Sequence, residues 1–556
     1  MKKIFCSLIG LFIVPTILSA QSLPTLPPSE VSFLQNCSLL EQKLQKWCEI
    51  REQRYREIQK YHQDHREGSK SLLVNANGGG QVPYILFRLF PELFPQIWGG
   101  NERPFDRIGL SLNDFYEQKN LLPLGIASGP TTVQLAAWLG EKRTLNKVTF
   151  SCVACHSGEV TKQDGQVLKV IGAPSTRINN LWFAFARTAE LPEFNSLNFR
   201  QAIKSKPAGW FYQNALLAET ESNELKWLTS PFALEEIVTQ FKLKAKAQLT
   251  AFNYLATYNY TFNSYAQDPL ESRRGSLDGL IPTLLAFIGD NLLRIDRQWQ
   301  GLPRAVAEVD PSSIWMQKNK GYKHWDGTQG VDLHRNAGAA AANLNSPVDI
   351  ENVSKITQFV ENLPAEPYPF DVDYLKAQKG QAHFVQNCIH CHSGPNKVID
   401  FKSIGTDPNR VAHFPPLIAE FQGKILQRNC ADARFCNKPD GAQYQPQELS
   451  LMALGYVGSS LEGIWARAPY LHNGSVPTLR ALLTNQRPEK FYRGNTRYDE
   501  KNVGFAWDYP TLQSVLFNTN ESGKSNRGHN SIETLGRDWG KNPIELDELL
   551  EYLKTL

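Results

Sequence analysis

Residues 373–392 read Asp-Tyr-Leu-Lys-Ala-Gln-Lys-Gly-Gln-Ala-His-Phe-Val-Gln-Asn-Cys-Ile-His-Cys-His. The pattern predicts a helix over 373–386, with Leu375, Phe384 and Val385 among its apolar positions. The helix leads into Cys388, Cys391 and His392, which are spaced as C-x-x-C-H. Two thiols three positions apart can reach the two vinyl groups on one edge of a porphyrin, and the adjacent histidine can then ligate the iron. The stretch therefore predicts a covalently bound haem c.

The end of the chain predicts a second helix that packs with the first. Asn542 is a candidate N-cap, and Pro543 suits the first helical position. Four leucines then share one stripe: Leu546, Leu549, Leu550 and Leu553. A helix before C-x-x-C-H that crosses a C-terminal helix is the plan of cytochrome c. We therefore expect residues 364–556 to form a cytochrome c-like haem domain enlarged by loops.

The same motif occurs once more, as Cys152-Val153-Ala154-Cys155-His156. A single copy could also be a redox dithiol, half of a zinc site or a chance match. Two copies behind an export signal favour haem, because c-type haem is assembled in oxidising compartments where free dithiols rarely persist. The sequence thus predicts two covalently bound haem c groups, with iron ligated by His156 and His392.

The export signal is read from residues 1–20. Lys2 and Lys3 precede an apolar run over 4–18, which is too short for an ordinary membrane span. A cleavage site after Ala20 completes the pattern of a signal peptide, and a retained N-terminal anchor is the alternative. We expect a periplasmic or secreted protein with no transmembrane segment.

Composition narrows the class of protein. The 556 residues are 41% hydrophobic and 21% charged, which is typical of a globular protein, and the net charge of +4 gives no support for nucleic-acid binding. Few segments alternate like strands, so a mainly α fold with long loops is expected. The predicted organisation is an N-terminal helical extension (21–100), a first haem domain with a helical insertion (101–363), and the second haem domain. The Pro-rich run over 362–370 is the candidate linker.

Four cysteines remain outside the motifs after removal of the signal. Cys430 and Cys436 lie close together and are expected to form a disulfide. A capping box at 38–41 predicts a helix that would separate Cys37 and Cys48 by about 16 Å. That separation exceeds the disulfide reach of about 7 Å. Pairing of Cys37 with Cys48 would require a break in this helix, so three connectivities stay open.

Methionine and histidine side chains are the candidates for the sixth ligand of each iron. Met452 lies in an apolar stretch and is expected to fill the core. His529 lies in a polar, Gly-containing loop before the last helix, and we predict that it ligates the second haem; an exposed loop histidine is the alternative. His472 could also ligate, but a hydrogen bond within the haem pocket is the preferred interpretation.

For the first haem, the candidate catalytic residues are aromatic or basic. His324 and Trp325 follow Trp315 in a Trp-rich segment. Such a segment suits a distal pocket or an electron route, and an ordinary aromatic core is the alternative.

Two further segments carry a family resemblance. Residues 468–475 (Ala-Pro-Tyr-Leu-His-Asn-Gly-Ser) and 403–408 (Ser-Ile-Gly-Thr-Asp-Pro), together with both C-x-x-C-H motifs, resemble the di-haem cytochrome c peroxidase superfamily. Residues 312–315, 324–327 and 491–494 look like the branch that contains the haem-type rubber oxygenases and their peroxidase-like relatives. The resemblance covers roughly residues 80–556.

This resemblance implies two cytochrome c-like domains that face each other, one haem being the active site and the other its electron-transfer partner. It implies His156 and His392 as proximal ligands and His529 as the distal ligand of the second haem. Bacterial di-haem peroxidases place a methionine shortly after the Ala-Pro-Tyr segment, but no methionine follows Met452 here. A bis-histidine second haem, as in the rubber oxygenase branch, fits the sequence better.

The expected function is that of an exported di-haem oxidoreductase that reduces peroxide at the first haem. Electrons would come from a small cytochrome or a cupredoxin, with Trp315, Trp325 or Trp182 as relays. One alternative is a dioxygenase that uses dioxygen to cleave a polyisoprenoid or another apolar substrate. The other is an electron-transfer cytochrome without catalysis.

Overall fold

The structure is a computed structural model of the 556-residue chain. It describes residues 37, 42–73, 75–77, 82–101, 105, 122–134, 142–174, 181–211, 218–258, 309–342, 348–395, 397–412, 423, 436–438, 440–445, 448, 455–511, 514–529 and 537–556. The expected signal peptide and Met452 lie outside these residues. Among the described helices, none combines the length and the apolar character that crossing a membrane requires.

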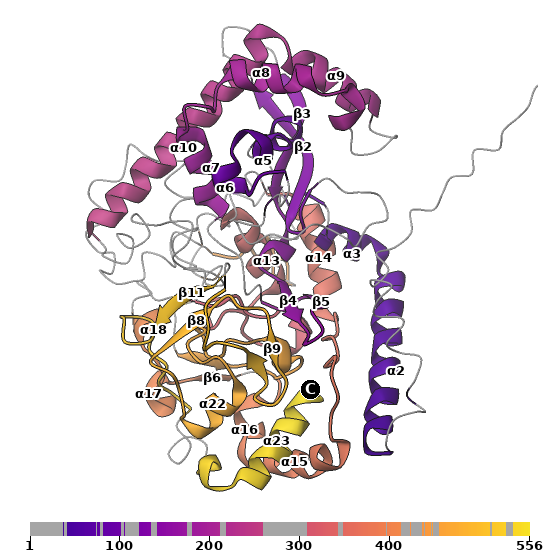
Figure 1. Ribbon diagram of the computed structural model, residues 1–556, viewed down its shortest axis with the longest axis vertical. Helices are drawn as coiled ribbons and strands as arrows, with labels where there is room; N and C mark the ends of the chain where they lie inside the picture. Colours follow the sequence, from indigo (N-terminus) through magenta and orange to yellow (C-terminus); the bar gives the residue numbers. More distant parts are fainter. Residues whose placement is uncertain are drawn as a thin grey trace, which may run out of the picture.

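Helices make up most of the described elements, and the strands are short apart from one hairpin (Figure 1). The first half contains the helices α2 (Gln42–Asp64), α3 (Arg66–Leu73), α4 (Tyr84–Phe87), α5 (Phe90–Leu93), α6 (Pro95–Trp98), α7 (Leu181–Glu190), α8 (Ser196–Ser205), α9 (Ala218–Leu228) and α10 (Pro231–Tyr258), and the strands β1 (Val82–Pro83), β2 (Ile126–Gln134), β3 (Lys142–Phe150), β4 (Ser157–Thr161) and β5 (Val167–Ile171). The second half contains α13 (Asp332–Ala342), α14 (Ile350–Glu361), α15 (Tyr374–Asn387), α16 (Ile389–His392), α17 (Phe401–Ile404), α18 (Asn409–Ala412), α22 (Leu479–Thr484) and α23 (Pro543–Lys554), with β6 (Lys397–Ile399), β7 (Tyr456–Gly458), β8 (Lys490–Arg493), β9 (Tyr498–Asp499), β10 (Gly504–Phe505) and β11 (Val515–Asn518).

The upper part of the molecule in Figure 1 is built on the long β2–β3 hairpin, in which Ile126 lies opposite Phe150. Helices α7 and α10 pack beside it around an aromatic core that includes Phe90, Trp98 and Phe185. The first C-x-x-C-H motif follows β3 directly. It therefore comes after a strand, whereas the second motif comes after a helix, and the expected pair of similar haem domains stays a prediction.

The lower part is organised by the crossing of α15 and α23. Asp373 caps α15 by accepting a hydrogen bond from the backbone N–H of Lys376, and α23 buries the four leucines of its predicted stripe. Phe384 is buried, while Leu375 and Val385 are exposed and do not join the core. Both helices lie within one or two residues of their predicted bounds.

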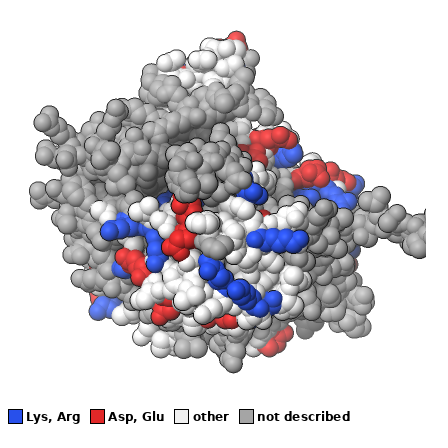
Figure 2. All heavy atoms as spheres, turned by 90° about the horizontal axis from the view of Figure 1, so that it is seen from above, with Lys and Arg blue, Asp and Glu red and all other residues white. Residues whose placement is uncertain are grey.

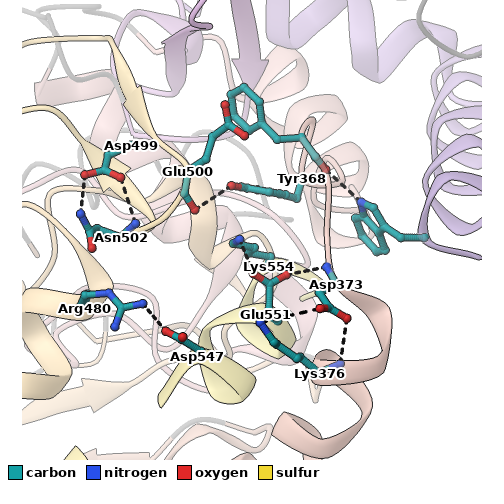
Figure 3. A network of polar contacts seen from close by, with 12 residues as sticks. Tyr368, Asp373, Lys376, Arg480, Asp499, Glu500, Asn502, Asp547, Glu551 and Lys554 are labelled. Atoms are coloured by element: carbon teal, nitrogen blue, oxygen red, sulfur yellow. Dashed lines mark hydrogen bonds and ion pairs between the residues drawn. The ribbon is translucent and has the colours of Figure 1, made fainter. Parts of the chain in front are cut away.

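Polar contacts join the start of α15 to the end of α23 (Figure 3). The Glu551 carboxylate accepts hydrogen bonds from the Asp373 backbone N–H (2.8 Å) and from Lys554 (2.7 Å). Arg480 of α22 pairs with Asp547 of α23 at 2.5 Å. These contacts fix the direction in which α15 approaches the second motif.

The candidate linker 362–370 is a buried segment that contacts distant parts of the chain. The Trp47 indole of α2 donates to the carbonyl of Phe370 (3.1 Å). Glu366 accepts from the backbone N–H of Ile171 (3.2 Å), and its carbonyl accepts from Trp465 (2.9 Å). Helix α2, at the right in Figure 1, thus packs against the outside of this segment. The domain boundary itself stays a prediction.

The cysteines of the N-terminal region form a disulfide. Cys37 and Cys48 are bonded, with their Cα atoms 5.5 Å apart. Helix α2 begins only at Gln42, so Cys37 lies before the helix, and the expected separation along a single helix was wrong. Cys436 is also disulfide-bonded; Cys430, its expected partner, and the capping box at 38–41 lie outside the described residues.

The surface carries charges of both signs. On the face shown in Figure 2, the described lysines and arginines are interspersed with aspartates and glutamates. Among the described residues of this face there is no extended patch of one sign, which agrees with the small net charge.

We predict that Gly380→Ala destabilises the lower part of the molecule. A Cβ at position 380 would overlap the carbonyl of Glu548 and lie 2.8 Å from the Cβ of Tyr552, so α15 and α23 would have to move apart. Overpacking of this kind costs about 2 kcal/mol of unfolding free energy. Urea unfolding followed by circular dichroism measures the loss. Gly209→Ala is the control, because a Cβ there meets no atom within 4 Å; equal stability of the two variants would contradict the prediction.

Candidate haem site

The second motif opens onto a large apolar cavity. Cys388 ends α15, and α16 carries Cys391 and His392. All three line a cavity with an empty volume of about 1340 Å³, including the part that is open to solvent. Much of its wall is aliphatic: Ile399, Ile404, Leu461, Ile464, Leu479, Leu482, Leu483, Leu549 and Leu553. Both thiols are free, so the attachment groups and a large apolar space occur together.

Two imidazoles face each other in this cavity. The ring centres of His392 and His529 are 6.1 Å apart, and the ring planes differ by 23°. Nδ1 of His392 bonds to the carbonyl oxygen of Ser459 at 2.8 Å, which leaves Nε2 for a metal. With metal–nitrogen distances of about 2 Å, as for zinc, two rings on opposite sides of one metal have centres about 6 Å apart. The residues present therefore fit a haem with two histidine ligands.

Burial keeps both imidazoles neutral. Desolvation, followed by the nearby His392 and Arg487, lowers the pKa of His529 to about 3. Desolvation also lowers the pKa of His392. A neutral imidazole has a free lone pair, which metal ligation requires. Burial raises the pKa of the Cys388 thiol to about 11, so this thiol is protonated at neutral pH.

The loop that carries His529 is held by the segment 468–475. The Asn473 amide donates to the carbonyls of Gly523 (3.2 Å) and Ser525 (3.0 Å). The Ser475 hydroxyl donates to the same Ser525 carbonyl at 3.0 Å. His529 has a φ of 52°, and its N–H donates to the carbonyl of Ile404 (3.1 Å). The position of this histidine therefore depends on the segment that carries the family resemblance.

A buried ion pair holds that segment in turn. The Arg493 guanidinium pairs with Asp310 at 2.7 Å and donates to the carbonyl of Asn473 at 2.9 Å. The backbone N–H of Asp310 donates to the carbonyl of His472 at 2.7 Å. Arg493 belongs to the 491–494 segment and Asn473 to the 468–475 segment, so two of the resembling segments meet here.

His472 lies on the wall of the same cavity. Its Nε2 is 3.2 Å from the hydroxyl of Tyr456, which donates its own proton to the carbonyl of Asp407 (2.6 Å). Nε2 of His472 is therefore the donor to Tyr456. The preferred interpretation, a hydrogen bond within the pocket, matches this geometry. The role of His472 in haem binding stays a prediction.

The first motif is arranged differently. Cys152 and Cys155 are free thiols around a short turn, and His156 is buried. Nε2 of His156 lies 3.3 Å from the guanidinium of Arg335, where a bound iron would lie. Burial, then Arg335 and Lys320, lowers the pKa of His156 well below its usual range. In this arrangement the residues do not fit a ligated iron unless Arg335 moves.

The candidate catalytic residues lie between the two motifs. His324 bonds to the hydroxyl of Thr328 (2.9 Å), and the Trp325 indole donates to the carbonyl of Asp310 (2.7 Å). Trp325 lines the cavity of the second motif, whereas the sequence predicts a place near the first haem.

Trp315 is buried between two glycines from the two halves of the chain. A Cβ at Gly172 or Gly463 would overlap its indole ring. The indole donates to the carbonyl of Ile171 (2.8 Å), and the N–H of Gly172 donates to the carbonyl of His156 (2.8 Å). Gly463 precedes Ile464, which lines the second cavity. Trp315 therefore bridges the surroundings of both motifs; the side chain of Trp182 lies outside the described residues.

Comparison with known families supports a cytochrome at the second motif. The family model described as RoxA-like, cytochrome c-like matches residues 455–493, which include the cavity wall from Tyr456 to Leu483. This match relates that part of the chain to cytochromes c and favours haem c as the bound group. A second family model, the Y4iN-like domain, matches residues 72–156 and so ends on His156.

Three proteins of Sinorhizobium fredii (strain NBRC 101917 / NGR234) are similar to parts of the chain. The uncharacterized protein y4iM is 34% identical over 286 residues, which is 46% of this chain and 66% of the relative. The uncharacterized protein y4iJ is 42% identical over 108 residues, 18% of each chain. The uncharacterized protein y4iN is 35% identical over 85 residues, 15% of this chain and 40% of the relative. The chain thus spans less than two thirds of each relative.

Several residues of the site have no local signal in the sequence. Ser459, Arg493 and Asp310 act through contacts with residues far away in the chain, so spacing could not reveal them. Arg335 is likewise brought to His156 only by the tertiary fold.

We predict that Asp310→Asn lowers the unfolding free energy by about 3 kcal/mol, because it leaves the Arg493 charge buried without its partner. Asp547→Asn removes a partly exposed pair with Arg480 and is expected to cost less than about 1 kcal/mol. Urea unfolding of the two variants in parallel measures the difference. Similar losses of unfolding free energy in both variants would contradict the structural role given to the Asp310–Arg493 pair.

Proposed function

We propose that the protein is an exported c-type cytochrome oxidoreductase. Haem c would be attached at Cys388 and Cys391, with His392 and His529 as its axial ligands. The observation that carries this proposal is the pair of half-buried, neutral imidazoles with ring centres 6.1 Å apart, in one apolar cavity with two free thiols. When bound, haem c supplies one-electron redox chemistry.

The residues around the cavity define what this site can do. Ser459 orients His392 through Nδ1, and Asn473 and Ser475 hold the loop of His529. Aliphatic side chains limit the access of water. A haem held by both His392 and His529 would favour electron transfer over the binding of peroxide.

We further propose that Cys152, Cys155 and His156 would hold a second haem c once Arg335 has moved away from His156, and that this haem would supply the reduction of peroxide. The repeated motif and the family resemblance support this part, whereas the contact of Arg335 with His156 requires a rearrangement on haem attachment. Trp315, packed between both motif regions, is the proposed electron relay, with Trp325 beside the second cavity. The proposed electron donor is a small cytochrome or a cupredoxin.

A dioxygenase that cleaves a polyisoprenoid is the second candidate, and the RoxA-like match favours it. Oxygen-dependent products from polyisoprene, without peroxide-driven oxidation of a reduced cytochrome, would select it over the peroxidase.

The ligand assignment predicts the spectrum of one variant. His529→Ala is expected to convert the low-spin ferric haem of the second motif to high spin, because one axial ligand is lost. Absorption and EPR spectra of the purified ferric protein measure the change. His472→Ala is the matched control from the same cavity and should keep the low-spin signal. If His472→Ala loses that signal and His529→Ala keeps it, the assignment is wrong.

The number of haems is a separate prediction. Intact mass and pyridine haemochrome spectra should give two covalent haems per chain. The double substitutions Cys152→Ala/Cys155→Ala and Cys388→Ala/Cys391→Ala should each remove one, and the first should abolish peroxide turnover with a reduced cytochrome. A wild-type protein with one haem, retained in the Cys152→Ala/Cys155→Ala variant, would refute the proposed first site.

A further inference from the structure

A smaller cavity adjoins the candidate haem site. It has an empty volume of about 440 Å³, including its open part. Four residues line both cavities, namely Trp325, Val457, Ser459 and Arg467. The remaining wall includes Lys320 and Lys323, so three basic side chains surround a small space next to the haem site.

These basic side chains are buried and incompletely neutralised. Lys320, Lys323 and Arg467 are each exposed by 9% or less. Nζ of Lys320 donates to the carbonyl (2.9 Å) and the hydroxyl (3.5 Å) of Ser313, both of which are uncharged. Arg467 donates to the carbonyls of Ser460 (2.8 Å) and Glu462. Its Nε makes no hydrogen bond with the described residues.

The nearby carboxylates do not balance these charges. Asp332 pairs with Lys323 at 3.1 Å, and the Glu462 carboxylate acts on both Lys320 and Arg467. Asp310 also lines the cavity, but it pairs with Arg493.

Arg335 adds a fourth cation close to Lys320. Glu361 also acts on Lys323. Four cations therefore stand against three carboxylates (Asp332, Glu361 and Glu462), which leaves an excess of positive charge. Buried charges without partners are costly, so an anion from outside the chain is expected.

We propose that this cavity receives the two propionate carboxylates of the haem c attached at Cys388 and Cys391, with Lys320 and Arg467 as their main partners. The proposal rests on the proposed function. The propionates of haem c project from the porphyrin edge opposite the thioether bonds. Lys320 and Arg467 donate to uncharged oxygen atoms, and lysine and arginine form stronger, charge-assisted hydrogen bonds with carboxylates.

The electrostatic surroundings of Lys320 also favour an anion in this cavity. Burial, followed by the charge of Arg467, lowers the pKa of Lys320 well below its usual range when no anion is present. A carboxylate in the cavity would offset both effects. A small exchangeable oxyanion such as phosphate would satisfy the same chemistry, and the experiment must therefore separate it from the haem's own carboxylates.

The test uses the holoprotein and its Lys320→Met variant. Removal of a buried positive charge should favour the ferric state and lower the midpoint potential of the low-spin haem. The expected change is at least tenfold in the reduction equilibrium constant, about 59 mV for one electron. The propionate bending mode in the resonance Raman spectrum should shift as well, because a direct hydrogen bond is lost. Spectroelectrochemistry measures the potential.

Matched variants separate this contact from a general charge effect. Lys320→Arg should retain the wild-type potential and Raman mode. Lys402→Met removes an exposed lysine from α17, whose Ile404 lines the haem cavity, and should leave both unchanged. Arg467→Gln should lower the potential in the same direction, which tests the proposal if Lys320→Met does not fold.

Haem content, measured on the same samples, distinguishes a failure of the propionate site from a failure of the proposed function. If the variants carry low-spin haem but keep the wild-type potential and Raman mode, the propionate site is wrong and the proposed function stands. If the wild-type protein carries no haem at Cys388 and Cys391, both are wrong. A saturable shift of the wild-type potential with added inorganic phosphate would overturn the propionate assignment in favour of an exchangeable anion.

Discussion

The buried pair of Arg493 and Asp310 supports the candidate site through a chain of contacts. Arg493 binds the carbonyl of Asn473, whose amide holds the carbonyl of Ser525, and the loop that follows carries His529. Each of these contacts satisfies a polar group that is costly to leave unpaired in the interior. The position of His529 therefore depends on an ion pair that does not contact its imidazole, and the segments 468–475 and 491–494 both contribute to holding this loop.

A second constraint is the low polarity of the cavity. The same apolar wall that would accept a porphyrin also lowers the pKa of His392 and of His529, which keeps both imidazoles neutral. The positive charges are instead concentrated in the adjoining cavity. The apolar cavity would suit the ring system of a haem, and the basic cavity would suit its ionised carboxylates. These two parts of the group require opposite surroundings.

The sequence predicted the local features of this arrangement. Helices α15 and α23 and the stripe with Leu549 follow from periodicity and capping, which act over a few residues. Contacts such as that of His392 with Ser459 join residues far apart in the chain, and periodicity carries no information on them. The Cys37–Cys48 pairing stayed open at the level of sequence, because a helix start shifted by a few residues changes which atoms can meet. The approach of Arg335 to His156 was unforeseen for the same reason, because it arises only in the tertiary fold.

The burial of the segment 362–370 bears on how the two halves could move. A proline-rich connector is commonly exposed, so that it can act as a hinge and be cut by proteases. Here Trp47, Trp465 and Ile171 bind its backbone and its Glu366 side chain from three directions. A hinge motion would have to break all of these contacts together. These contacts therefore oppose a hinge motion at this segment, and they also protect its backbone from proteases.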